Sequence, residues 1–108
     1  MIVYIAGPMT GLPEYNYPAF HAAAAHARTL GYEVINPADN FDGDTTLPWA
    51  TYLRQALRQV LDADAIVVLP GWESSKGAQL ETHVARTLAM PVIELAALRR
   101  ATLSLSHR

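Results

Sequence analysis

The chain has 108 residues, no cysteine and a formal net charge of -2 at pH 7. This length fits a single domain spanning 1–108 that buries a core without covalent staples, and the composition excludes disulfides and cysteine-based metal sites. The charge, without a cluster of lysine and arginine beyond "LRR" near the end, predicts that no nucleic-acid polymer is a partner. The opening "MIVYIAGPM" has no basic segment and only a short apolar run. It therefore predicts neither a signal peptide nor a membrane span, and favours a cytoplasmic location.

Strand and helix patterns alternate from the start of the chain. "IVYIA" (2–6) is an apolar run ended by a Gly-Pro pair, which predicts a strand buried on both faces. A helix is expected next, with Asn16 as its cap, a proline in its first turn and its end at Gly31. Its apolar stripe consists of Phe20, Ala23, Ala24, Ala27 and Leu30. "YEVIN" (32–36) predicts the second strand.

The same alternation continues in the second half. "PADNFDGDTTLP" is too rich in breakers to be regular, and Pro48 then opens a helix. The apolar side of this helix carries Leu53, Leu57, Val60 and Leu61. "AIVVLP" (65–70) and "PVIEL" predict the third and fourth strands, on either side of a helix that begins after Lys76. The tail, about 96–108, is expected to hold a short last helix.

This order of elements predicts a small flavodoxin-like or Rossmann-like α/β fold. It is a doubly wound sheet of about four or five parallel strands with helices on both faces. Ligands of such sheets bind outside the carboxyl ends of the strands, where the strand order reverses. Three loops, 7–15, 37–47 and 71–76, meet that edge. Asp64 precedes its strand and belongs to the opposite edge, where a turn or cap role is expected.

Glu81 is the most informative single residue. It shares one face of its helix with apolar positions, namely Gly77, Ala78, Val84, Ala85 and Leu88. A buried carboxylate needs a compensating partner or a cavity, and Glu81 lies just over one turn from the positive end of its helix. We expect it to face a ligand pocket. The plain structural alternative is a bond to a neighbouring backbone group or arginine.

Three blocks of the chain carry a resemblance to a known family. "VYIAGPM", "DADAIVVLPGW" and "SSKGAQLETHVARTLAMPV" resemble the nucleoside 2-deoxyribosyltransferase superfamily. The closest resemblance is to its short branch, a domain of unknown function with the opening "AGPMTGLPEYNYPAF", and it extends to about Pro91. It implies that Glu81 attacks the anomeric carbon of a deoxyribosyl group and that Tyr4 hydrogen-bonds and orients it. It also implies that Ser75 and Gly77 help to hold a 5'-phosphate.

The chemistry of this reaction suits these residue types. Breaking a glycosidic bond passes through an oxocarbenium-like state, which a carboxylate stabilises or captures as a covalent intermediate. The loop before the helix carries hydroxyls at Ser74 and Ser75 and a cation at Lys76, which predicts an anion cradle. Further substrate-binding candidates at this edge are Gly7, Pro8 and Met9, although they could equally serve only to shape a turn.

One position departs from the resemblance. Members of the superfamily often carry an Asp eight residues before the acid that starts the third strand, and counting back from Asp64 leads to Ala56. Asp39, Asp42 or Asp44 in the second loop could replace the missing acid, and we take Asp39 as a substrate-binding candidate.

The sequence predicts no cofactor and no metal. There is neither a dinucleotide-binding glycine motif nor a Walker motif. Histidines without metal-ligand spacing are His21, His26, His83 and His107. Aromatic residues that could stack a nucleobase, form a lid or contact another subunit are Tyr15, Tyr17, Trp49 and Trp72.

Three functions of different classes follow. The first is cleavage or transfer at the N-glycosidic bond of a 2'-deoxynucleoside or its 5'-monophosphate, with water or a second base as acceptor. The second is a non-catalytic nucleotide-binding or sensing module with the same pocket, and the third is a structural or interaction domain. The resemblance also implies a homodimer or larger homo-oligomer in which a neighbouring subunit completes the pocket.

Overall fold

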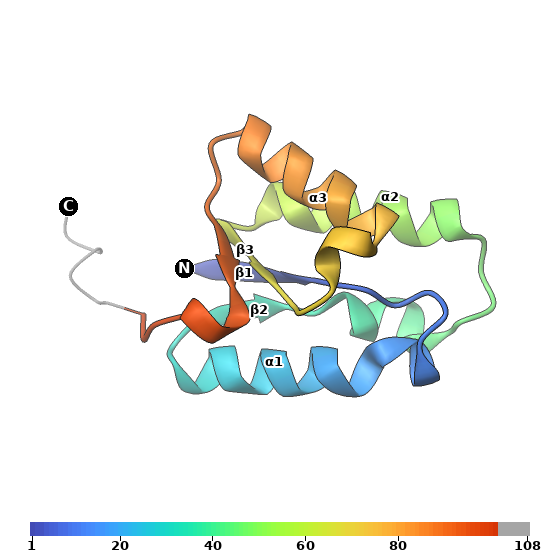
Figure 1. Ribbon diagram of the computed structural model, residues 1–108, viewed down its shortest axis with the longest axis horizontal. Helices are drawn as coiled ribbons and strands as arrows, with labels where there is room; N and C mark the ends of the chain where they lie inside the picture. Colours follow the sequence, from blue (N-terminus) through green and yellow to red (C-terminus); the bar gives the residue numbers. More distant parts are fainter. Residues whose placement is uncertain (102–108) are drawn as a thin grey trace.

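The computed structural model describes residues 1–101, in which four parallel strands form one sheet between layers of helices (Figure 1). The strands are β1 (Ile2–Ala6), β2 (Glu33–Ile35), β3 (Ala65–Val68) and β4 (Val92–Glu94). The helices are α1 (Tyr17–Thr29), α2 (Trp49–Asp62) and α3 (Lys76–Thr87). Short 3-10 segments are η1 (Pro13–Asn16), η2 (Pro37–Gly43), η3 (Trp72–Ser74) and η4 (Leu95–Ala97).

The strand order β2-β1-β3-β4 explains the layering. The chain moves outward from β1 to β2, then returns past β1 to β3 and continues to β4. Right-handed crossovers therefore place α1 on one face of the sheet and α2 and α3 on the other, as Figure 1 shows. The expected doubly wound, all-parallel α/β fold is confirmed. The order reverses between β1 and β3, so their carboxyl ends form the edge where a ligand is expected.

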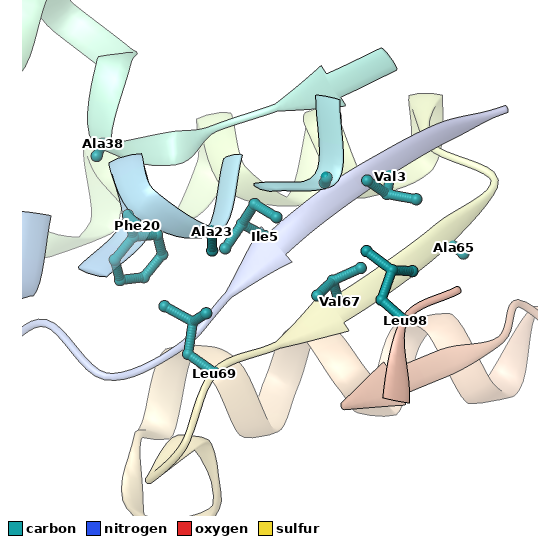
Figure 2. Close-up of a cluster of buried hydrophobic side chains, with 10 residues drawn as sticks. Val3, Ile5, Phe20, Ala23, Ala38, Ala65, Val67, Leu69 and Leu98 are labelled. Carbon is teal, nitrogen blue, oxygen red and sulfur yellow. The ribbon is translucent and has the colours of Figure 1, made fainter. Parts of the chain in front are cut away.

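Alternation along β1 divides the core into two layers. Val3 and Ile5 pack with Phe20 and Ala23 of α1, and Figure 2 shows these side chains in the space between that helix and the sheet. Tyr4 and other residues of the opposite face pack with α2 and α3. Because a fully buried Val or Ile side chain contributes about 1.5–3 kcal/mol, the face of β1 that packs against α1 stabilises the fold.

The start of α1 differs from the expected one. Asn16 does precede the helix, but its backbone is left-handed (φ 60) and its side chain makes no capping bond. Its amide nitrogen instead donates to the carbonyl oxygen of Pro8 at 2.9 Å. The prediction that Asn16 caps α1 is wrong, because the side chain closes the preceding loop.

Two expected core leucines are exposed. Leu61 has an exposed fraction of 62%, since α2 faces the sheet with Ala56 and Val60. Leu88 has an exposed fraction of 52%, because α3 ends at Thr87 before the apolar face makes another turn. The structure thus contradicts both burial predictions.

The sequence predicts an irregular second loop, 37–47, and a short helix in the tail, about 96–108. The loop contains the segment η2, within which Phe41 and Asp42 have left-handed backbones and break the helical geometry. In the tail, η4 is a single short turn, and the rest of the expected last helix, 102–108, lies outside the described residues. Within residues 1–101, none of the helices is long and apolar enough to cross a membrane.

Candidate functional site

A cavity of about 740 Å³ opens at the carboxyl edge of β1 and β3. All three expected loops contribute to its wall. The loop residues that line it are Gly7, Met9, Thr10, Tyr15, Pro37, Asn40, Thr45, Leu47, Ser74, Ser75 and Lys76. The end of β1, the first turn of α1 and the first two turns of α2 and α3 complete it. Its volume lies within the range of pockets that bind small molecules.

Glu81 and Tyr4 meet on the wall of this cavity. The Tyr4 hydroxyl donates a hydrogen bond of 2.6 Å to Oε2 of Glu81, and the two residues have exposed fractions of only 1% and 6%. Tyr4 points toward α3 because side chains alternate along β1, whereas Glu81 faces the sheet from one turn inside the helix. The carboxylate is thus bonded to a tyrosine hydroxyl, in contrast to the backbone or arginine partner of the plain alternative.

The surroundings of the pair change its acid-base chemistry. Burial raises the pKa of Glu81 from 4.5 to about 7, and the hydrogen bond from Tyr4 opposes part of that rise. Burial, with the neighbouring carboxylate, also raises the pKa of Tyr4 well above its usual value. A carboxylate poised near neutral pH in a cavity is typical of functional sites.

The N-terminus of α3 provides a second polar wall. Ser75 is the N-cap residue of the helix, and its Oγ accepts from the amide of Ala78 at 3.2 Å. The amides of the first turn have no intrahelical acceptors, and the helix dipole adds a partial positive charge there. Lys76 and Gly77 line the cavity beside them, and a side chain at Gly77 would meet open space. Ser74 also lines it, while its hydroxyl donates to the carbonyl of Gly71 at 3.0 Å.

Close packing against Leu69 helps to fix the position of the first loop, 7–15. Gly7 and Met9 line the cavity, whereas Pro8 lies outside it, where its carbonyl holds Asn16. A Cβ atom at Gly7 would lie 2.8 Å from Cβ of Leu69. Glycine therefore allows the end of β1 to approach the residue that follows β3.

The structure brings none of the three loop aspartates into the cavity. Asp39 is exposed, with its carboxylate 3.8 Å from Nδ1 of His21. Asp42 is also exposed, and Asp44 accepts bonds from the amide and hydroxyl of Thr46, which lower the pKa of its carboxyl. At the position where the resemblance has an acid, Ala56 lines the cavity.

Asp64 lies at the opposite edge of the sheet, as its place before β3 predicts. Its Oδ2 accepts a hydrogen bond of 2.7 Å from the amide of Ile2. The backbone amide of Asp64 also donates to the carbonyl of Ile2 at 2.8 Å. This residue joins the starts of β1 and β3, which is a structural role.

Three of the four singled-out aromatic residues reach the cavity. They are Tyr15, Tyr17 and Trp49, and burial together with nearby Tyr52 raises the pKa of Tyr17. Trp72 does not line the cavity, and Arg86 lies over its ring at 5.6 Å from the centroid. The sequence analysis did not single out Phe20 or Tyr52 as site residues, although Tyr52 follows Trp49 by one helical turn.

Asn40 is a lining residue that the sequence analysis also missed. Its side-chain amide makes two hydrogen bonds with that of Gln59 on α2, at 2.9 and 2.8 Å. This pair fastens the second loop to α2 and fixes which atoms of Asn40 are free for a ligand. No local sequence pattern predicts an amide pair of this kind.

The described residues contain no cluster of three or more histidine, cysteine, aspartate or glutamate side chains that could hold a metal ion. His21 lies next to Asp39 and Asn36, outside the cavity. His107 lies outside the described residues.

A comparison with protein families places these residues in a wider group. A family model described as a domain of unknown function, DUF4406, matches residues 1–94. The matched range contains every residue that lines the cavity. A search of curated proteins found no match to the chain.

Proposed function

The chain belongs to the DUF4406 family, and we propose that it cleaves or transfers the N-glycosidic bond of a 2'-deoxynucleoside or its 5'-monophosphate. The observation that carries this proposal is the buried pair of Glu81 and Tyr4 on the wall of a cavity large enough for a nucleotide. The resemblance of three sequence blocks to the nucleoside 2-deoxyribosyltransferase superfamily supports it, because the nucleophile and its orienting hydroxyl fall on the same two residues.

Each wall of the cavity has a role in this reaction. One oxygen of the Glu81 carboxylate accepts the Tyr4 hydrogen bond, which leaves the other oxygen for the anomeric carbon. The carboxylate stabilises the oxocarbenium-like transition state or forms a covalent glycosyl ester. The first turn of α3, with Ser75 and Lys76, receives the 5'-phosphate. Water completes a hydrolysis, and a second base completes a transfer.

A non-catalytic nucleotide-binding module is the second candidate. The observation that favours it is Ala56, which lines the cavity where the resemblance has a helper carboxylate. Such a module would bind the nucleotide at the same walls without breaking a bond. In either case a small polar substrate and the lack of cysteine fit a reducing, cytoplasmic location.

Base release from a panel of deoxynucleosides and their 5'-monophosphates tests the proposal. Half of the reactions contain a second base, and free base and new nucleoside are measured by chromatography and mass spectrometry. We expect Glu81→Gln to lower the rate of base release on the order of 1,000-fold, since it removes the nucleophile. Tyr4→Phe is expected to lose less, because it keeps the carboxylate.

The matched control is Glu33→Gln, which removes the same charge from an exposed residue of β2 outside the cavity. It should release base at the rate of the unchanged protein. If no base appears with any substrate while a nucleotide still raises the melting temperature, the binding module is the correct function.

A further inference from the structure

The number of acidic side chains in the cavity limits which substrates the site accepts. Of the cavity-lining residues within 1–101, Glu81 is the one with an acidic or imidazole side chain. If it attacks the sugar, it cannot protonate the departing base in the same step. The substrate chemistry must therefore work without a second carboxylic acid.

The other side-chain donors that line the cavity within residues 1–101 are phenols, alcohols, an amide, an indole and one lysine, and none of them is a carboxylic acid or an imidazole. Tyr4 already donates to Glu81, and the hydroxyl of Tyr52 donates to the carbonyl of Asp44. Tyr17 has a raised pKa, which makes its hydroxyl a weaker acid. Lys76 is exposed and lies in the first turn of α3, among amides that attract an anion.

A neutral purine or pyrimidine and a cationic base differ in this respect. The neutral base leaves as an anion unless an acid protonates it during bond cleavage. A base that carries a fixed positive charge, such as a pyridinium or an N7-alkylated purine, leaves as a neutral molecule. Its departure needs no proton, so a site with one carboxylate is sufficient.

The walls of the cavity suit a cationic ring. Aromatic side chains contribute much of the lining, namely Tyr15, Tyr17, Phe20, Trp49 and Tyr52. The faces of such rings attract a cation, most strongly in the case of tryptophan. With Glu81 as the acid of the cavity, these walls favour a positively charged base over a neutral one of the same shape.

We propose that the preferred substrate is a 2'-deoxynucleoside 5'-monophosphate whose base carries a fixed positive charge. The inference rests on the proposed function, and it names the substrate class of the same site. It follows from the single carboxylate, the engaged or weakly acidic hydroxyls and the aromatic walls.

The reaction balances with water as the one co-reactant. A Glu81 oxygen forms a bond to C1' while the bond from C1' to the ring nitrogen breaks. The electron pair of the broken bond stays on the ring nitrogen and neutralises the base. Water then adds to the glycosyl ester and releases the sugar phosphate. This step regenerates the Glu81 carboxylate and releases one proton from the water to solvent. No oxidant, reductant or metal is required.

Two matched substrate pairs test this preference. The first is N7-methyl-2'-deoxyguanosine 5'-monophosphate against 2'-deoxyguanosine 5'-monophosphate, which share sugar and phosphate. The second is 2'-deoxynicotinamide mononucleotide against its dihydro form, whose ring is neutral but almost identical in shape. Rates with the unchanged protein are corrected for those with Glu81→Gln, which report spontaneous base release.

We expect kcat/KM to be at least about 100-fold higher for the cationic member of each pair, since the neutral one lacks its proton donor. With 2'-deoxynicotinamide mononucleotide, kcat/KM should rise as Glu81 ionises and stay level to about pH 8.5. A fall above neutral pH would reveal an essential acid and would overturn the inference.

Binding provides a readout independent of turnover. In the Glu81→Gln background, Trp49→Leu should weaken binding of 2'-deoxynicotinamide mononucleotide about fivefold and change binding of its dihydro form less. The matched control is Trp72→Leu in the same background, because Trp72 lies outside the cavity. Equal losses for the two ligands with Trp49→Leu would contradict a cationic preference.

Failure of this inference is distinguishable from failure of the proposed function. Glu81-dependent release from neutral nucleotides at rates equal to or above those of their cationic partners would overturn the substrate class and leave the glycosidic activity intact. No Glu81-dependent release from any member of either pair or of the deoxynucleotide panel would overturn both.

Discussion

Glu81 and Tyr4 are 77 positions apart in sequence and form one hydrogen-bonded unit in the folded chain. Placing a carboxylate in this position has a cost, because burial disfavours its charged form. The hydrogen bond from the Tyr4 hydroxyl offsets part of this cost, because it lowers the pKa of Glu81 whereas burial raises it. A group that costs stability and lines a cavity is better explained by function than by folding.

The raised pKa of Glu81 predicts how stability depends on pH. Between pH 4.5 and about 7 the carboxyl is ionised in the unfolded chain and protonated in the folded one. The folded state binds more protons, so the free energy of unfolding falls as pH rises through this window. The total loss is about 3 kcal/mol for a shift of this size. Glu81→Gln should remove that contribution to the pH dependence.

Urea unfolding of both proteins from pH 4 to pH 8 measures the effect. The stability gained by Glu81→Gln relative to the unchanged protein should grow with pH and level off above the folded pKa. Parallel stability profiles for the two proteins would show that the carboxyl titrates normally and that its burial has no such cost.

At the scale of elements, two positions at the ends of secondary structure hold glycine for different physical reasons. Gly7 follows β1, where a Cβ atom would press on Leu69 at 2.8 Å. Gly77 lies in the first turn of α3, where a Cβ atom would meet no heavy atom within 4 Å. Both line the cavity, but one is required by packing and the other leaves space for a ligand.

Alanine substitutions separate these two roles. Gly7→Ala should destabilise the protein by about 1–3 kcal/mol through overpacking. Gly77→Ala should stabilise it by up to about 1 kcal/mol, because alanine is the better helix former. The added methyl group at position 77 should still weaken binding of a deoxynucleoside 5'-monophosphate. Urea unfolding and calorimetric titration measure the two effects.

Each variant serves as the control for the other. If Gly77→Ala binds the monophosphate as tightly as the unchanged protein, the start of α3 does not hold the phosphate. If Gly7→Ala is as stable as the unchanged protein, the approach of β1 to Leu69 is not tightly packed.

At the scale of the whole molecule, the doubly wound topology gathers three loops and three helix starts around one cavity. Large apolar side chains are exposed on these loops and on the adjoining start of α2: Leu12, Tyr15, Phe41 and Trp49 have exposed fractions of 41–54%. A second copy of the chain would cover these side chains, in line with the homo-oligomer that the resemblance implies.

We therefore expect the protein to sediment as a dimer or larger assembly of the 11.8 kDa chain. Leu12→Asp should shift the equilibrium toward the monomer, since Leu12 belongs to the loop beside the cavity. Leu61→Asp is the matched control, because Leu61 is exposed near the far end of α2. A mass of one chain for the unchanged protein, or a larger effect of Leu61→Asp, would contradict this arrangement.

The sequence by itself determined the fold class and the course of the chain. Apolar runs such as 2–6 and 65–70 indicate strands covered on both faces, and the stripes between them indicate crossover helices. These patterns are periodic and local, so they can be recognised without knowing which residues lie nearby in the folded chain. The placement of Glu81 on an apolar helix face followed from the same periodicity, and the structure places it on the wall of the cavity.

Only the tertiary structure decided which side chains share the cavity. Loops have no period, so the sequence could not separate Asn40, which lines the cavity and pairs with Gln59, from Asp39, which faces solvent beside His21. The exposure of Leu61 depended in the same way on which face of α2 meets the sheet. Partners distant in sequence set these outcomes, because a side-chain bond or contact is defined by position in space and leaves no local pattern.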